Sequence, residues 1–73
     1  MLSIARKRLS IERQIDEWEE VAFNAEVAHR VHARLKADAA TLKQFVDRMT
    51  NAEIAITDLR EQLAALDADA ASA

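Results

Sequence analysis

Large apolar residues recur through the second half of the chain at alternating spacings of three and four. This heptad pattern is typical of a helix that packs one face against another helix. The opposite face of the same segment carries Asp, Glu, Asn and Gln side chains, so we expect burial on one side only. The apolar positions are Leu42, Phe45, Met49, Ala52, Ile56, Leu59, Leu63 and Leu66.

The first half of the chain predicts a helix from about Ser3 to about Lys36, with its main apolar stripe running through Trp18 and Leu35. A second, weaker stripe follows the far side of this helix, and between 21 and 31 nearly the whole circumference is apolar. One neighbouring helix cannot cover both sides, so we expect homo-oligomerisation through this second stripe. Its interface residues are Leu9, Phe23, Val27 and Val31.

The segment between the two halves predicts a turn. Thr41 with Gln44 matches a capping box, the side-chain pattern that begins a helix, and Asp38 is the best available substitute for a glycine in the left-handed conformation. We therefore predict an all-α fold: an antiparallel two-helix, coiled-coil-like hairpin that assembles into a homo-oligomeric helical bundle. The expected bounds are 3–36 for the first helix, 37–41 for the turn, 41–67 for the second helix and 68–73 for a frayed tail.

One continuous helix is the alternative, because several apolar residues from Val21 through Leu35 and Leu42 to Leu63 lie at multiples of seven. Charge favours the hairpin. Basic residues crowd the start of the first helix and Asp67 and Asp69 lie near the end of the second, so folding the chain back brings opposite charges together.

Composition narrows the class of protein. The 73 residues allow one small domain, and the counts of Gly 0, Pro 0 and Cys 0 exclude disulfides, cysteine metal sites and glycine-rich phosphate loops. No uncharged apolar run approaches the ~18 residues of a membrane span, and the start of the sequence lacks a signal-peptide core, which favours a cytoplasmic location. The net charge of -3 argues against a protein that coats nucleic acid with its whole surface. No serine lies near a histidine by helical spacing, so we expect no hydrolase chemistry. We also expect no cofactor.

A Glu-x-x-His pattern is the one candidate for metal chemistry. Glu26 and His29 share a helix face, and Glu53 falls at the same level across the hairpin. A two-fold dimer would gather four carboxylates and two imidazoles, a ligand set that resembles that of ferritin-like, iron-oxidising hairpins, whose site spans a dimer interface. The alternative interpretation is that Glu26 pairs with Arg30 on the surface while His29 is a half-buried core residue.

A basic arm, formed by Arg6, Lys7, Arg8 and Arg13, is the candidate for binding an anionic partner such as nucleic acid, an acidic protein or lipid. The alternative is an intramolecular match with the acidic end of the second helix. Taken together, the sequence indicates a small non-catalytic interaction or regulatory protein of bacterial or phage type, whose partners are its own copies and another protein. A metal-binding hairpin and a nucleic-acid-associated regulator remain as alternative functions.

Overall fold

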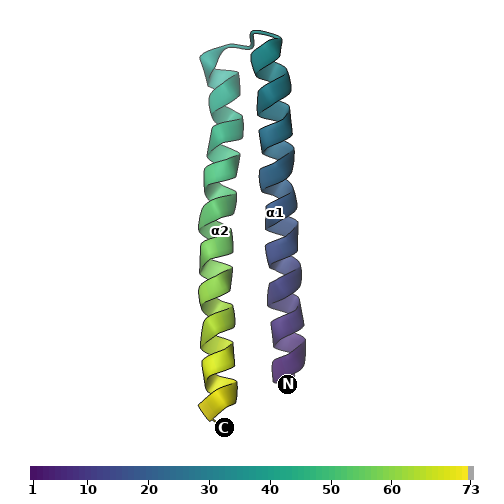
Figure 1. Cartoon of the computed structure of the whole chain (residues 1–73), viewed down its shortest axis with the longest axis vertical. Coiled ribbons are helices and arrows are strands. Elements are labelled where there is room, and N and C mark those ends of the chain that lie inside the picture. The colour runs from purple at the N-terminus through teal and green to yellow at the C-terminus, as the bar shows by residue number, and fades with distance from the viewer. Residues whose placement is uncertain (73) are drawn as a thin grey trace.

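The chain folds into two long antiparallel helices, α1 (Ile4–Arg34) and α2 (Ala39–Ser72), with both termini at the same end (Figure 1). The computed structural model describes residues 1–72, and these residues contain no strand. The molecule measures 56 × 16 × 15 Å. The predicted all-α hairpin is therefore confirmed, and the single continuous helix is wrong. Within residues 1–72, neither helix is long and apolar enough to cross a membrane.

Helix α1 begins with a side-chain cap that the sequence analysis did not assign. The Ser3 hydroxyl accepts a hydrogen bond from the Arg6 amide at 3.2 Å, and the Ser3 carbonyl accepts one from the Lys7 amide at 3.0 Å. A serine at this position stabilises the helix start because it satisfies one of the amides that lack an intrahelical partner.

The turn between the helices is shorter than predicted and uses a different residue for the reversal. Lys36 has a positive φ of 58°. Its amide donates to the Ala33 carbonyl at 3.1 Å, and the Ala37 amide donates to the His32 carbonyl at 3.0 Å. These two bonds form a Schellman motif, which satisfies the last carbonyls of α1. The expectation that Asp38 takes the left-handed conformation is therefore wrong.

Asp38 instead caps α2. Its carboxylate accepts a hydrogen bond from the Thr41 amide at 2.8 Å, and its carbonyl accepts one from the Leu42 amide at 3.1 Å. Thr41 is thus the third residue of the helix and receives the cap, so the capping box with Gln44 is not the start of α2. The bonds from Thr41 hold the pKa of Asp38 below its ordinary value, since they stabilise the ionised carboxylate.

The far end of α2 also differs from expectation. Residues 68–72 continue the helix, and the Ser72 hydroxyl donates to the Ala68 carbonyl at 2.9 Å. Four of these five residues are alanine or serine in an alanine-rich stretch, and alanine has the highest helix propensity. The last residue of the predicted frayed tail, Ala73, lies outside the described residues.

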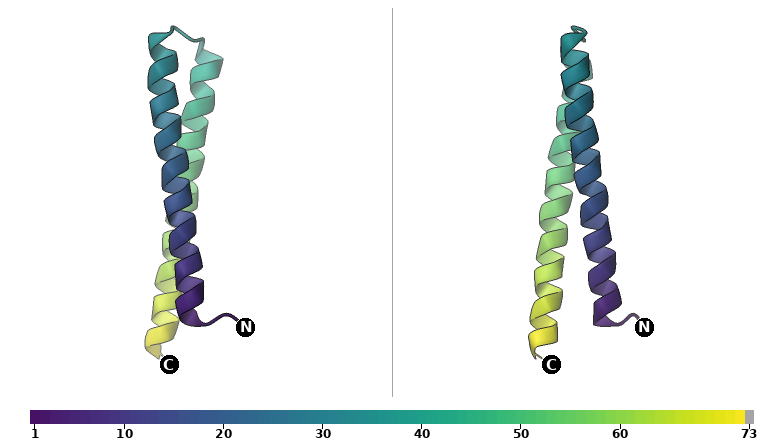
Figure 2. Two further views of the ribbon diagram at one scale, coloured as in Figure 1. Left: turned by 90° about the vertical axis from the view of Figure 1, so that its right-hand side faces the viewer. Right: turned by 45° about the vertical axis from the view of Figure 1, so that its right-hand side comes forward.

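The core is a narrow seam between the helices, which lie side by side in Figure 1 and cross each other in the left view of Figure 2. Every heptad position of α2 is buried or half-buried, and the most buried side chains are Ala25, Ala52 and Leu59. Two residues expected in the seam differ. Leu35 caps the end of α1 and is 72% exposed, because the helix stops there, and Trp18 lies at the seam edge with 37% of its surface exposed. The α1 side of the seam is formed by Ile11, Ile15, Ala22, Ala25, His29 and His32.

Candidate functional site

The face of α1 that points away from α2 carries a row of exposed apolar side chains, which we call the outer row: Phe23, Val27 and Val31. Phe23 is 62% exposed, Val27 47% and Val31 50%. Their spacing of four places them one above another on a single helix face. The seam residues Ala25 and His29 occupy the opposite side of the same turns, so α2 cannot cover the outer row.

Leu9, the fourth residue predicted for the oligomer interface, is also exposed. It lies on the same side of α1 as the outer row, but Arg13, Asp16 and Glu20 intervene on that side. The structure therefore presents a compact apolar row beside the turn and a separate leucine near the N-terminus, and the outer row is the larger continuous surface.

The turn end of the seam carries a polar and aromatic cluster. The rings of His32 from α1 and Phe45 from α2 lie with their centroids 4.9 Å apart, and the guanidinium carbon of Arg48 lies 5.6 Å from the centre of the Phe45 ring. Phe45 is thus in contact with a histidine on one helix and a cation on its own helix, contacts that fix its ring in the seam.

The candidate metal ligands do not converge within one chain. Glu26 and Glu53 are both exposed, whereas His29 is half-buried in the seam. Among residues 1–72, no group of three or more Asp, Glu or His side chains is close enough to hold a metal ion, so this ligand set requires a second chain. The surface pair proposed as the alternative, Glu26 with Arg30, is absent from the ion pairs of the described residues.

Ion pairs join the two helices at the open end of the hairpin. Arg8 of the basic arm binds Asp67 of α2 and also Glu12 at 3.0 Å, and the hydrogen bond to Asp67 raises the pKa of the arginine above its ordinary value. Further along, Arg60 lies 3.6 Å from Glu19. Arg8 is therefore engaged within the chain, as the intramolecular interpretation of the basic arm predicts. Asp69 forms no such pair within residues 1–72.

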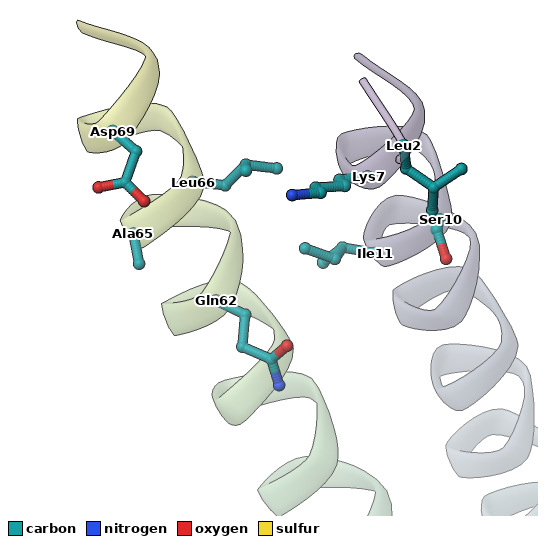
Figure 3. Close-up of a pocket in the computed structure, with 8 residues that line it drawn as sticks. All are labelled: Leu2, Lys7, Ser10, Ile11, Gln62, Ala65, Leu66 and Asp69. Atoms are coloured by element: carbon teal, nitrogen blue, oxygen red, sulfur yellow. The ribbon is translucent and has the colours of Figure 1, made fainter. Parts of the chain in front are cut away.

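Two shallow hollows flank the first turns of α1. One, of about 420 Å³, lies between the helix ends, where Lys7 and Ile11 of α1 point toward Leu66 of α2 (Figure 3). The other, of about 230 Å³, is lined by the remaining arginines of the basic arm together with two leucines and a serine: Arg6, Arg13, Leu2, Leu9 and Ser10. Both hollows are open to solvent.

The Glu19–Arg60 ion pair, the Asp38 cap and the left-handed Lys36 were not predicted from the sequence. The pairing of Glu19 with Arg60 needs the true turn geometry, because a shift of a few residues in the turn changes which side chains face each other across the seam. The Asp38 cap could have been found, since Asp is among the best N-cap residues and Thr41 follows it by three. Lys36 gave no signal, because a lysine with positive φ is uncommon.

A scan of this chain against protein-family models, a search of curated proteins and a search of solved structures each found no match.

Proposed function

We propose that the chain is a non-catalytic helical interaction module that associates with its own copies through the outer row of α1. The observation that carries this proposal is the exposure of Phe23, Val27 and Val31 on the side of α1 that α2 cannot reach. Apolar side chains that share one exposed helix face fit the packing of a second helix on that face. The faces left free after self-association are the ones offered to another protein.

The small core supports the proposal. Among the described residues, the buried apolar side chains are Ala25, Ala52 and Leu59, and two of them are alanines that contribute little apolar area. A chain of this length has marginal stability from its own core, and association is one of the few remedies open to a chain without cysteine.

The exposed surface supports it as well. The hairpin has 5679 Å² of accessible surface, whereas a compact folded monomer of 8.2 kDa exposes roughly 4,500 Å². The hairpin thus exposes roughly 1,200 Å² more than a compact monomer, because it is a rod, and this excess is larger than the roughly 800 Å² that each partner buries in a standard interface. A second hairpin laid along α1 would therefore cover part of this excess surface on each chain.

Sedimentation velocity on Val27→Glu tests the proposal, with Val46→Glu as the matched control. Val27 and Val46 are 47% and 44% exposed, so the two substitutions remove similar side chains and add the same charge. Val46 belongs to α2 and lies outside the outer row. We expect the wild type and Val46→Glu to sediment as the same oligomer and Val27→Glu to dissociate, because a buried unpaired carboxylate opposes association.

A wild type that is monomeric at micromolar concentration would refute self-association. Equal behaviour of the two variants would show that the outer row is not the contact surface. Helical circular dichroism of each variant separates dissociation from unfolding, since Val27 and Val46 both lie on exposed faces and neither substitution should melt the hairpin.

A further inference from the structure

Charged residues of opposite sign bracket the outer row along α1. Glu20 lies seven residues before Val27 and Arg34 lies seven residues after it. Both side chains are exposed, and within residues 1–72 neither forms an ion pair. At spacings of three and four, Glu20, Phe23, Val27, Val31 and Arg34 all lie on one face of the helix.

This order of charges selects one orientation for a second copy. In a parallel pair, residues of equal number face each other, so Glu20 would face Glu20 and Arg34 would face Arg34. In an antiparallel pair with a two-fold axis at Val27, residues equally far from Val27 come level, because both helices have the same rise per residue. Glu20 of each copy then faces Arg34 of the other.

The same axis matches the remaining residues of the face. Phe23 comes level with Val31 of the other copy, and the two Val27 side chains meet at the axis. A Glu20–Arg34 pair lies at each end of this apolar centre. The apolar centre is thus enclosed by polar pairs at both ends, which is the usual arrangement of a protein interface.

We propose that a second copy of this chain docks antiparallel on the outer face of α1 about a two-fold axis at Val27, with reciprocal Glu20–Arg34 ion pairs that fix the register. This inference rests on the self-association proposed above and adds its geometry. The assembly is an array of four helices in which the two α1 helices are central and each α2 lies outside. Leu9 falls beyond the overlap and is not part of this interface.

Charge reversal tests the register. We expect Glu20→Arg and Arg34→Glu each to raise the dissociation constant of the dimer about tenfold, because the two-fold axis turns two attractive contacts into two repulsive ones. The double variant Glu20→Arg/Arg34→Glu restores both contacts and should return to within about threefold of the wild type. Glu61→Arg on the exposed face of α2 makes the same change of charge outside the interface and should leave the constant unchanged.

Mixing the two single variants gives a second readout. In the mixed dimer each reversed residue faces an opposite charge, so native mass spectrometry should show the heterodimer in excess over both homodimers. In a parallel dimer, Glu20→Arg would replace one like-charge contact by another and leave the dissociation constant unchanged. An unchanged constant, with a dimeric wild type, would therefore overturn the antiparallel register. A monomeric wild type would overturn the register and the proposed function together, and would leave the face to a different protein.

Discussion

At the scale of single residues, the turn depends on two side chains with separate tasks. Lys36 occupies the left-handed position that ends α1, and Asp38 caps the first amides of α2. A left-handed conformation is costly for any residue with a Cβ atom, whereas an aspartate cap is favourable. The turn therefore combines one strained residue with one stabilising residue, and substitution should change stability in opposite directions.

Lys36→Gly should stabilise the hairpin by about 1 kcal/mol, because glycine adopts a positive φ without a steric penalty. Chemical denaturation at a fixed chain concentration measures the change. Lys43→Gly is the matched control, since it places the same substitution inside α2, where glycine costs about 1 kcal/mol and the exposed Lys43–Asp47 pair is also lost. A loss of stability in Lys36→Gly would contradict the assignment of Lys36 as the reversal point.

Asp38→Ala should lower the melting temperature by roughly 4–8 °C at pH 7, the effect of one lost helix cap in a domain of this size. Because the folded state lowers the pKa of Asp38, the benefit of the ionised cap is complete above the ordinary value of 3.8 and disappears as the pH falls through the lower folded value. The difference between wild type and variant should therefore shrink below about pH 3.8. Glu61→Ala, an exposed position inside α2, should not lower the melting temperature, and an equal loss there would refute a special role for Asp38.

His29→Leu should leave stability unchanged or increase it, since His29 is half-buried in an otherwise apolar seam. Iron, zinc or manganese should leave the melting curve of the wild type unmoved. A rise in melting temperature with one of these metals, lost in His29→Ala, would instead support the ligand set of Glu26, His29 and Glu53 across a dimer.

At the scale of the helices, the repeat of apolar positions predicted which face of α2 is buried. The heptad from Leu42 to Leu66 lies in the seam at every position, because a continuous pattern of this length leaves a helix only one apolar face. The ends of the helices were less predictable. The caps depend on single hydrogen bonds that Ser3 and Asp38 accept, and the turn depends on one that the Lys36 amide donates. Several polar residues near each helix end offered comparable caps.

The candidate site was predictable to a similar degree. Phe23, Val27 and Val31 were identified from the second apolar stripe, because residues four apart share a helix face whatever the position of the turn. Leu35 was expected in the seam because the apolar pattern continues to Leu42. It is exposed because α1 ends before it and the chain reverses at Lys36.

Ala52→Leu should destabilise the hairpin by about 1–3 kcal/mol, because Ala52 has no exposed surface and the added carbons have no space between the two helices. Ala64→Leu is the matched control on the exposed side of α2 and should change stability by less than about 0.5 kcal/mol. Thermal or urea denaturation of both variants at equal concentration makes the comparison. If the Ala52→Leu variant is as stable as the wild type, the two helices do not approach each other closely at Ala52.

At the scale of the whole molecule, the hairpin is a rod with two different sides. Its inner seam is closed by apolar packing and by the Arg8–Asp67 and Glu19–Arg60 pairs, while the outer face of α1 keeps an apolar row with charges of opposite sign at its ends. A rod of 56 × 16 × 15 Å has a small core and a large exposed surface, and the proposed pairing along α1 would bury part of that surface. The shape of the molecule and the outer row both support the self-association that we propose.

Sedimentation equilibrium of the wild type over a range of micromolar concentrations tests this central claim most directly. We expect the mass of two 8.2 kDa chains, which should fall toward the mass of one chain on dilution. A mass of one chain throughout, with the helical content of the folded hairpin, would contradict it.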